Sequence, residues 1–171
     1  MSLISEQIII TMEALILIDI QCGLTRKKTL YNAKLFFDTV NSAIKAFRLS
    51  GLKIIFVQHN NTQLQKDTND WEIDPILDKQ EYDIVIQKIH GNAFHDSDLK
   101  AILSKFGIND ITISGLVSHG CVKATCMGAL AEGFKTSLLK NGHTTWNKDA
   151  KVKIDQTEKE LIEKGVQMVC F

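Results

Sequence analysis

The chain has 171 residues, of which 44% are hydrophobic and 23% are charged, and twenty basic residues balance twenty acidic ones. This balance excludes a strongly basic nucleic-acid-binding protein and an acidic disordered tail. One proline and ten glycines exclude a collagen-like or linker-rich sequence. We therefore expect one globular domain over residues 1–171.

The start of the chain lacks the basic segment and the small-residue cleavage site of a secretory signal. Its longest apolar run, residues 14–18, ends at Asp19 and is far shorter than the about 20 residues that span a bilayer. The four cysteines show neither a CxxC pair nor the spacing of a disulfide framework; they are Cys22, Cys121, Cys126 and Cys170. We expect a reduced, cytoplasmic protein that binds neither membranes nor nucleic acid.

Short apolar runs typical of strands alternate with helical patterns along the chain. ALILI (14–18) precedes a helix that Asn32 can cap and Gly51 ends, and KIIFV (53–57) follows. The polar stretch 58–80 is long for a plain connection, and such loops are usually functional or partly helical. DIVIQ (83–87) then precedes a second helix, which Ser97 can cap and Gly107 ends.

The second half of the chain repeats this alternation. DITIS (110–114) precedes a helix from about Cys121 to Gly133, and KTSLL (135–139) precedes a helix over about 148–164. VQMVC (166–170) can add a short sixth strand. The pattern predicts an α/β fold: a three-layer, doubly wound, mostly parallel sheet of five to six strands with helices on both faces.

In such sheets the active site lies at the carboxyl ends of the strands. Asp19 and Lys88 directly follow two predicted strands, and Cys121 follows a third after a short loop. A helix start and a nearby ammonium both lower the pKa of a thiol, and a carboxylate can take its proton. Each residue alone is commonly structural, but the three together predict a nucleophilic site. In a 3-2-1-4-5 strand order, Lys88 must reach inward across one strand.

Four segments resemble the isochorismatase-like cysteine hydrolase superfamily, in the same order and with the same spacing. They are ALILIDIQ, VIQKIHGNAFHDSDL, ISGLVSHGCVKATCMGALAEGF and NGHTTW, within about residues 14–165. The resemblance implies that Cys121 is the nucleophile, that Asp19 accepts its proton and that Lys88 orients Asp19. It also implies an oxyanion hole formed by the backbone N–H groups of Val117 and Cys121, and a cis peptide bond at Leu116–Val117.

Departures from the family pattern narrow the predicted chemistry. Nicotinamidases of the superfamily bind a metal through an aspartate and histidines after the second strand, but here that segment reads Gln58-His59-Asn60-Asn61. We therefore expect no metal and no other cofactor. Isochorismatases proper lack the nucleophilic cysteine, so Cys121 favours hydrolysis of a C–N bond: amide, ureido or carbamoyl. The side chains expected to contact a small-molecule substrate are Gln21, His59, Trp71, Phe94 and Ser118.

Other functions compete with this hypothesis. A catalytically silent or oligomerising domain could retain the fold, and homologues of this kind commonly form homo-oligomers, which we expect here. A thiol-redox protein could use Cys121 with Cys126, but a helix places residues five apart on different faces. A dinucleotide-binding domain is disfavoured because no GxGxxG follows any predicted strand.

Overall fold

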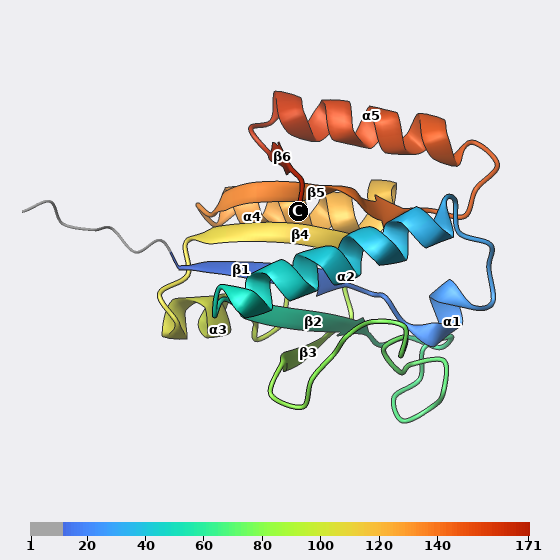
Figure 1. The fold of residues 1–171 in the computed structure, drawn as a ribbon, viewed down its shortest axis with the longest axis horizontal. Coiled ribbons are helices and arrows are strands. Elements are labelled where there is room, and N and C mark those ends of the chain that lie inside the picture. Colours follow the sequence, from blue (N-terminus) through green and yellow to red (C-terminus); the bar gives the residue numbers. More distant parts are fainter. Residues whose placement is uncertain (1–11) are drawn as a thin grey trace, which may run out of the picture.

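The computed structural model describes residues 12–171 and confirms the predicted α/β class. A parallel six-stranded sheet has the order β3-β2-β1-β4-β5-β6, so the strand order reverses at β1 (Figure 1). The strands are β1 (Glu13–Ile18), β2 (Lys53–His59), β3 (Ile84–Lys88), β4 (Asp110–Leu116), β5 (Lys135–Thr144) and β6 (Gln167–Val169).

Helices pack on both faces of this sheet. One face is covered by α2 (Ala33–Leu49), and the other by α3 (Leu99–Lys105) and α4 (Lys123–Ala131), while α5 (Ala150–Glu163) lies along the β5–β6 side (Figure 1). Two short segments complete the set: α1 (Cys22–Thr25) and the π-helical turn η1 (Ser118–Val122).

The uninterrupted apolar character of β1 follows from this three-layer packing. Successive side chains of a strand point to opposite faces, and here both faces are covered. Ile16 and Ile18 lie in the core beneath α3 and α4, whereas Leu15 and Leu17 lie in the core beneath α2. A strand buried on both faces brings its carboxyl end into the interior, which explains why the next residue, Asp19, is only 2% exposed.

Several local expectations need correction. Asn32 precedes α2 in a left-handed conformation (φ 48°) and makes no capping hydrogen bond with its side chain. Ser97 lies one residue before the N-cap, although its Oγ accepts the Leu99 N–H at 3.2 Å. The helix expected from about Cys121 starts at Lys123, because η1 intervenes.

Strand β5 is longer than its apolar run indicated. After a register shift, His143 and Thr144 pair with Gly115 and Leu116, so the ladder continues through the polar segment. Lys140 therefore lies inside the strand and not at its end. The apolar pattern misses this extension because Asn141 takes up the irregularity with a positive φ of 60°.

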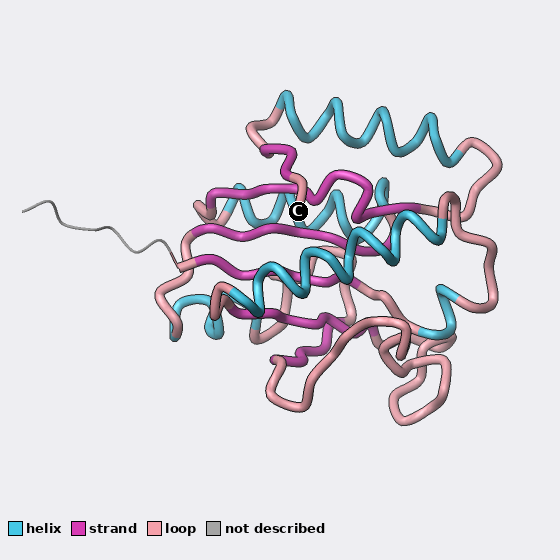
Figure 2. Tube along the Cα trace, in the orientation of Figure 1, coloured by secondary structure: helices cyan, strands magenta, loops and turns pink. Residues whose placement is uncertain are grey.

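The segment between β2 and β3 forms neither a regular helix nor a strand. Its only ladder contact is an isolated antiparallel bridge between Gln21 and Ile73, which places it beside α1 (Figure 2). Within residues 12–171, none of the helices has the length and apolar character needed to cross a membrane.

We expect Gly115→Ala to destabilise the protein more than Gly133→Ala. Both glycines have positive φ (128° and 85°), but a Cβ at Gly115 would lie 2.1 Å from the Ile18 carbonyl oxygen, whereas Gly133 has open space. The conformational penalty alone costs about 1–2 kcal/mol, and forcing atoms into a packed site adds about 1–3 kcal/mol. Urea unfolding of both variants measures the difference; equal losses would contradict the close approach of β4 to β1.

Candidate active site

Asp19 is positioned by the end of β1. Its backbone N–H donates to the Val57 carbonyl at 3.0 Å, and its own φ of 55° turns the chain out of the strand. The neighbouring strand approaches closely here, where Ile18 pairs with Gly115. Asp19 thus lies at the carboxyl end of a central strand, at the point where the strand order reverses. This is the usual ligand site of such folds.

Lys88 reaches Asp19 across the end of β2. It is the last residue of β3, and its side chain is completely buried. Its Nζ lies 2.9 Å from Asp19 Oδ2, 2.7 Å from His59 Nδ1 and 3.0 Å from the His90 carbonyl oxygen. These three acceptors match the three N–H donors of an ammonium, so the charge is fully hydrogen-bonded without water.

His59 belongs to this cluster as a neutral imidazole. It pairs with Lys88 in the β2–β3 ladder, and because the ammonium can only donate, His59 Nδ1 accepts and the ring proton lies on Nε2. Burial and the Lys88 charge lower the pKa of His59, which keeps the ring neutral. Sequence reasoning named His59 as a substrate contact and missed its contact with Lys88, although the two residues end neighbouring parallel strands.

Cys121 lies on η1, beside the other three side chains. Its Sγ is within 4.8 Å of a carboxylate oxygen of Asp19 and a ring nitrogen of His59. Asp19 Oδ1 is buried and has no hydrogen-bond partner within the described residues, so it is free to accept the thiol proton. The peptide bond between Leu116 and Val117 is cis, in the loop that leads into η1.

The electrostatics decide which of the opposing influences on the thiol pKa of Cys121 prevails. Burial raises the pKa of Cys121 to about 11, and the nearby Asp19 charge raises it further than Lys88 lowers it. The pKa of Asp19 is also raised, because burial outweighs the Lys88 ammonium. Helix α4 begins only at Lys123, so Cys121 is not at its first turn. The thiol is therefore protonated at neutral pH and faces a carboxylate of increased basicity.

Asp19, His59 and Cys121 are close enough for their ligand atoms to surround a metal ion. However, the Lys88 ammonium already binds Asp19 Oδ2 and His59 Nδ1 at 2.9 and 2.7 Å. A second cation among the same atoms would be repelled by this buried charge and would lose these two ligand atoms. The arrangement of this cluster suits acid–base and nucleophilic chemistry.

Gln21 and Trp71, expected to contact substrate, make hydrogen bonds to backbone and side-chain groups next to the site. The fully buried Gln21 amide donates to the His59 and Trp71 carbonyls at 3.1 and 2.8 Å and accepts from the His59 N–H at 2.8 Å. Trp71 is 8% exposed, and its indole N–H donates to Asn60 Oδ1. Gln21 therefore ties the 60–83 segment to the end of β2.

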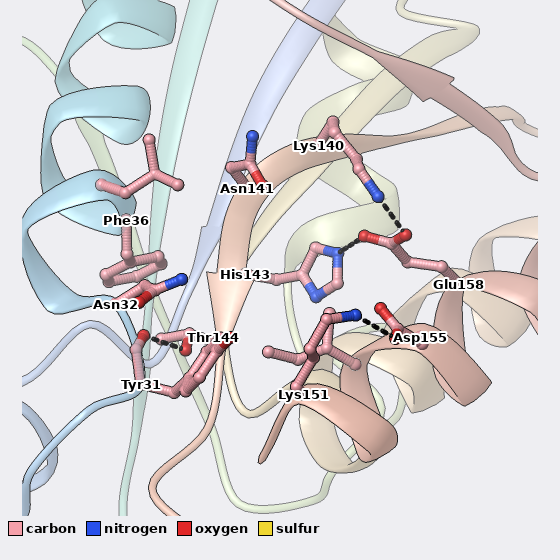
Figure 3. Close-up of a pocket in the computed structure, with 12 residues that line it drawn as sticks. Tyr31, Asn32, Phe36, Lys140, Asn141, His143, Thr144, Lys151, Asp155 and Glu158 are labelled. Carbon is pink, nitrogen blue, oxygen red and sulfur yellow. Dashed lines mark hydrogen bonds and ion pairs between the residues drawn. The ribbon is translucent and has the colours of Figure 1, made fainter.

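Ser118, another expected substrate contact, is fully buried, and its hydroxyl contacts the His143 ring. The Ser118 Oγ lies 2.8 Å from His143 Nδ1. On the other side of the ring, His143 Nε2 lies 3.2 Å from Glu158 Oε1, as Figure 3 shows. Lys140 pairs with the same carboxylate, and the side chains of Lys140, His143 and Glu158 border a cavity of about 220 Å³. The pKa of Glu158 is lowered, chiefly by its hydrogen bond with His143. This buried chain of contacts supports the loop that begins at Val117.

Phe94 is partly buried against the core under α3 and α4, where its ring centroid lies 5.4 Å from that of Phe134. Of the five side chains expected to contact substrate, only His59 therefore reaches the Asp19–Lys88 pair.

Residues 13–161 match the isochorismatase domain family, so the chain belongs to this family. It is 24% identical over 149 residues to streptothricin hydrolase from Streptomyces noursei, and the match covers 85% of this chain and 54% of that protein. The chain thus spans about half the length of this curated relative.

Solved structures show the same fold. An isochorismatase family protein superposes with a TM-score of 0.88 at 28% identity, covering 92% of this chain and 97% of that one. Pyrazinamidase of Pyrococcus horikoshii, in complex with zinc, superposes with a TM-score of 0.81 at 22% identity, covering 93% and 99%.

We expect Asp19→Asn to increase the reactivity of Cys121 toward iodoacetamide. The substitution removes the negative charge that raises the pKa of Cys121, so the midpoint of the alkylation rate against pH should fall below about 11. Each unit of lowering gives about ten times more thiolate at a fixed lower pH. Lys88→Met should shift the midpoint in the opposite direction. Peptide mass mapping measures both, with the exposed Cys170 as internal reference; unchanged midpoints would contradict the cluster.

We expect the imidazole of His59 to titrate below 6.5 and to shift upward in Lys88→Met. The Lys88 charge is one of the causes that lower the pKa of His59, so its removal makes protonation easier. An NMR titration of the ring signals measures both values. Lys123→Met, which removes an ammonium paired with Glu160, is the control and should leave His59 unchanged.

Proposed function

We propose that the protein is a cysteine hydrolase that cleaves a C–N bond of a small molecule, of the amide, ureido or carbamoyl type. The observation that carries this proposal is the buried Lys88–Asp19 ion pair beside the Cys121 thiol. An ionised carboxylate with one free oxygen next to a protonated thiol is a base paired with a nucleophile.

The reaction follows from the positions of these groups. Cys121 Sγ attacks the carbonyl carbon while its proton passes to Asp19, and the carbonyl oxygen becomes an oxyanion. The N–H groups of Val117 and Cys121 would stabilise this oxyanion. When the tetrahedral intermediate collapses, the C–N bond breaks, and Asp19 returns the proton to the leaving nitrogen. A thioester remains on Cys121.

Water then hydrolyses the thioester in a second step, in which Asp19 is again the base and Cys121 is the leaving group. Asp19 takes a proton from the water that attacks the thioester carbon, and Cys121 leaves as a thiol when the proton is returned to sulfur. Lys88 keeps Asp19 in place and balances its charge throughout. His59, whose ring is neutral, holds the ammonium from its other side.

Membership in the isochorismatase family supports this proposal, as does the similarity to a streptothricin hydrolase. The pyrazinamidase with the same fold, named for an amide substrate, is consistent with it. A thiol-redox function is disfavoured, because Cys126 is fully buried in the core and burial raises the pKa of its thiol to about 12. Assembly into a homo-oligomer and a cytoplasmic location stay predictions.

A panel of amides, ureido acids and N-carbamoyl compounds, screened for release of ammonia, tests the proposal. For any substrate found, Cys121→Ser and Asp19→Asn should each lower kcat about a thousandfold or more, as removal of a catalytic nucleophile or base does. Cys170→Ser, which changes an exposed cysteine, should keep full activity.

The combination of variants separates an enzyme from a silent domain. In Asp19→Asn, turnover should fall although the Cys121 thiolate becomes easier to form, because the proton has no acceptor. A variant that gains alkylation and keeps turnover would show that Asp19 is not the base. Ammonia release that survives Cys121→Ser would exclude the thioester route.

A further inference from the structure

A second group of ligand side chains lies on the loop between β3 and α3 and takes no part in the proposed reaction. Its members are His90, His95 and Asp96, whose ligand atoms all lie within 4.8 Å of one another. The Nε2 atoms of His90 and His95 lie 3.3 and 3.4 Å from the same carboxylate oxygen, Asp96 Oδ2. Two imidazoles and a carboxylate therefore converge on one point.

These separations are longer than strong hydrogen bonds and similar to those between ligand atoms of a metal site, although the stacked rings are not yet aimed at one ion. Charge-assisted N–H···O bonds are about 2.7–2.9 Å long, shorter than both contacts. Zinc binds nitrogen and oxygen ligands at about 2.0–2.2 Å, so two ligand atoms of a tetrahedral site are about 3.3–3.5 Å apart. We propose that His90, His95 and Asp96 bind one divalent transition-metal ion, of the class of zinc, nickel or cobalt, with water completing its coordination.

The loop that carries these ligands is attached firmly to the domain. The His90 carbonyl accepts a hydrogen bond from the buried Lys88 ammonium at 3.0 Å. The N–H of the fully buried Ala93 donates to Thr125 Oγ1 on α4 at 3.1 Å. Because the backbone is held at His90 and again at Ala93, between the two histidines, ion binding orders mainly side chains, and this lowers its entropic cost.

The side chains must turn to bind the ion. The rings of His90 and His95 stack with centroids 3.9 Å apart and an interplanar angle of 13°. A metal ion bound by an imidazole nitrogen lies in the plane of that ring. Two stacked, nearly parallel rings do not share such a position, so the rings must rotate apart to bind the same ion. The two side chains are 39% and 58% exposed and that of Asp96 is 70% exposed, which leaves room for this rotation.

This site differs from the Cys121 cluster, where the Lys88 ammonium already provides the positive charge. The proposal does not depend on hydrolase activity, and metal binding is measured directly. Equilibrium dialysis of the protein without a polyhistidine tag against Zn²⁺, followed by elemental analysis, should give one ion per chain. Co²⁺ should give the visible absorption of a nitrogen- and oxygen-ligated ion, without a thiolate charge-transfer band.

Matched variants locate the ion. His95→Gln and Asp96→Asn should each weaken binding at least tenfold. Asp98→Asn, a neighbouring carboxylate that makes no capping hydrogen bond, and His119→Gln, an exposed histidine elsewhere, should leave binding unchanged. Cys121→Ser should also keep the ion.

Three results would overturn the proposal. The first is no Zn²⁺ binding at millimolar concentration. The second is equal affinity in wild type and His95→Gln. The third is loss of the ion in Cys121→Ser with retention in His95→Gln and Asp96→Asn, which would assign the ion to the catalytic cluster. Circular dichroism of each variant confirms that it is folded, so a loss of binding reports on the ligands alone.

Discussion

A buried ammonium, that of Lys88, organises the carboxyl edge of this sheet. Transfer of a single charge into the interior costs several kcal/mol unless it is paired and hydrogen-bonded. Lys88 meets this demand with Asp19, His59 and the His90 carbonyl, each from a different segment of the chain. The ends of β1, β2 and β3 are thereby held together around one charge. Gly115 lets β4 approach β1 closely beside it.

This charge arrangement also underlies the proposed role of Cys121 as a nucleophile. Asp19 is bound to Lys88 through one oxygen, and its other oxygen is free. The same carboxylate, together with burial, keeps the Cys121 thiol protonated. In the proposed reaction, a thiolate therefore forms only as the proton passes to Asp19. In the proposed mechanism, Cys121 and Asp19 form a proton-transfer pair beside the Lys88 ammonium, in contrast to a preformed thiolate at a helix start.

The loop after β3 links this pair to the proposed metal site through a single residue. The His90 backbone accepts from Lys88, and its side chain contacts Asp96. On the β5 side, the contact between Ser118 and His143 supports the loop that precedes Cys121. The proposed catalytic groups are thus held on two sides by polar contacts within the protein.

The sequence by itself determined the fold class, and it singled out Asp19, Lys88 and Cys121 as chemically reactive residues that follow predicted strands; the strand order itself comes from the structure. Strand runs and helical periodicity are local signals, and parallel strands bring their carboxyl ends to one edge. Only the tertiary structure decided the role of His59, the raised pKa of Cys121 and the structural roles of Gln21 and Ser118. Each depends on burial and on contacts between segments far apart in the chain, such as Lys88 and Asp19, which are 69 positions apart. Local sequence patterns do not indicate which distant segments come into contact, or how far a charged side chain is removed from water.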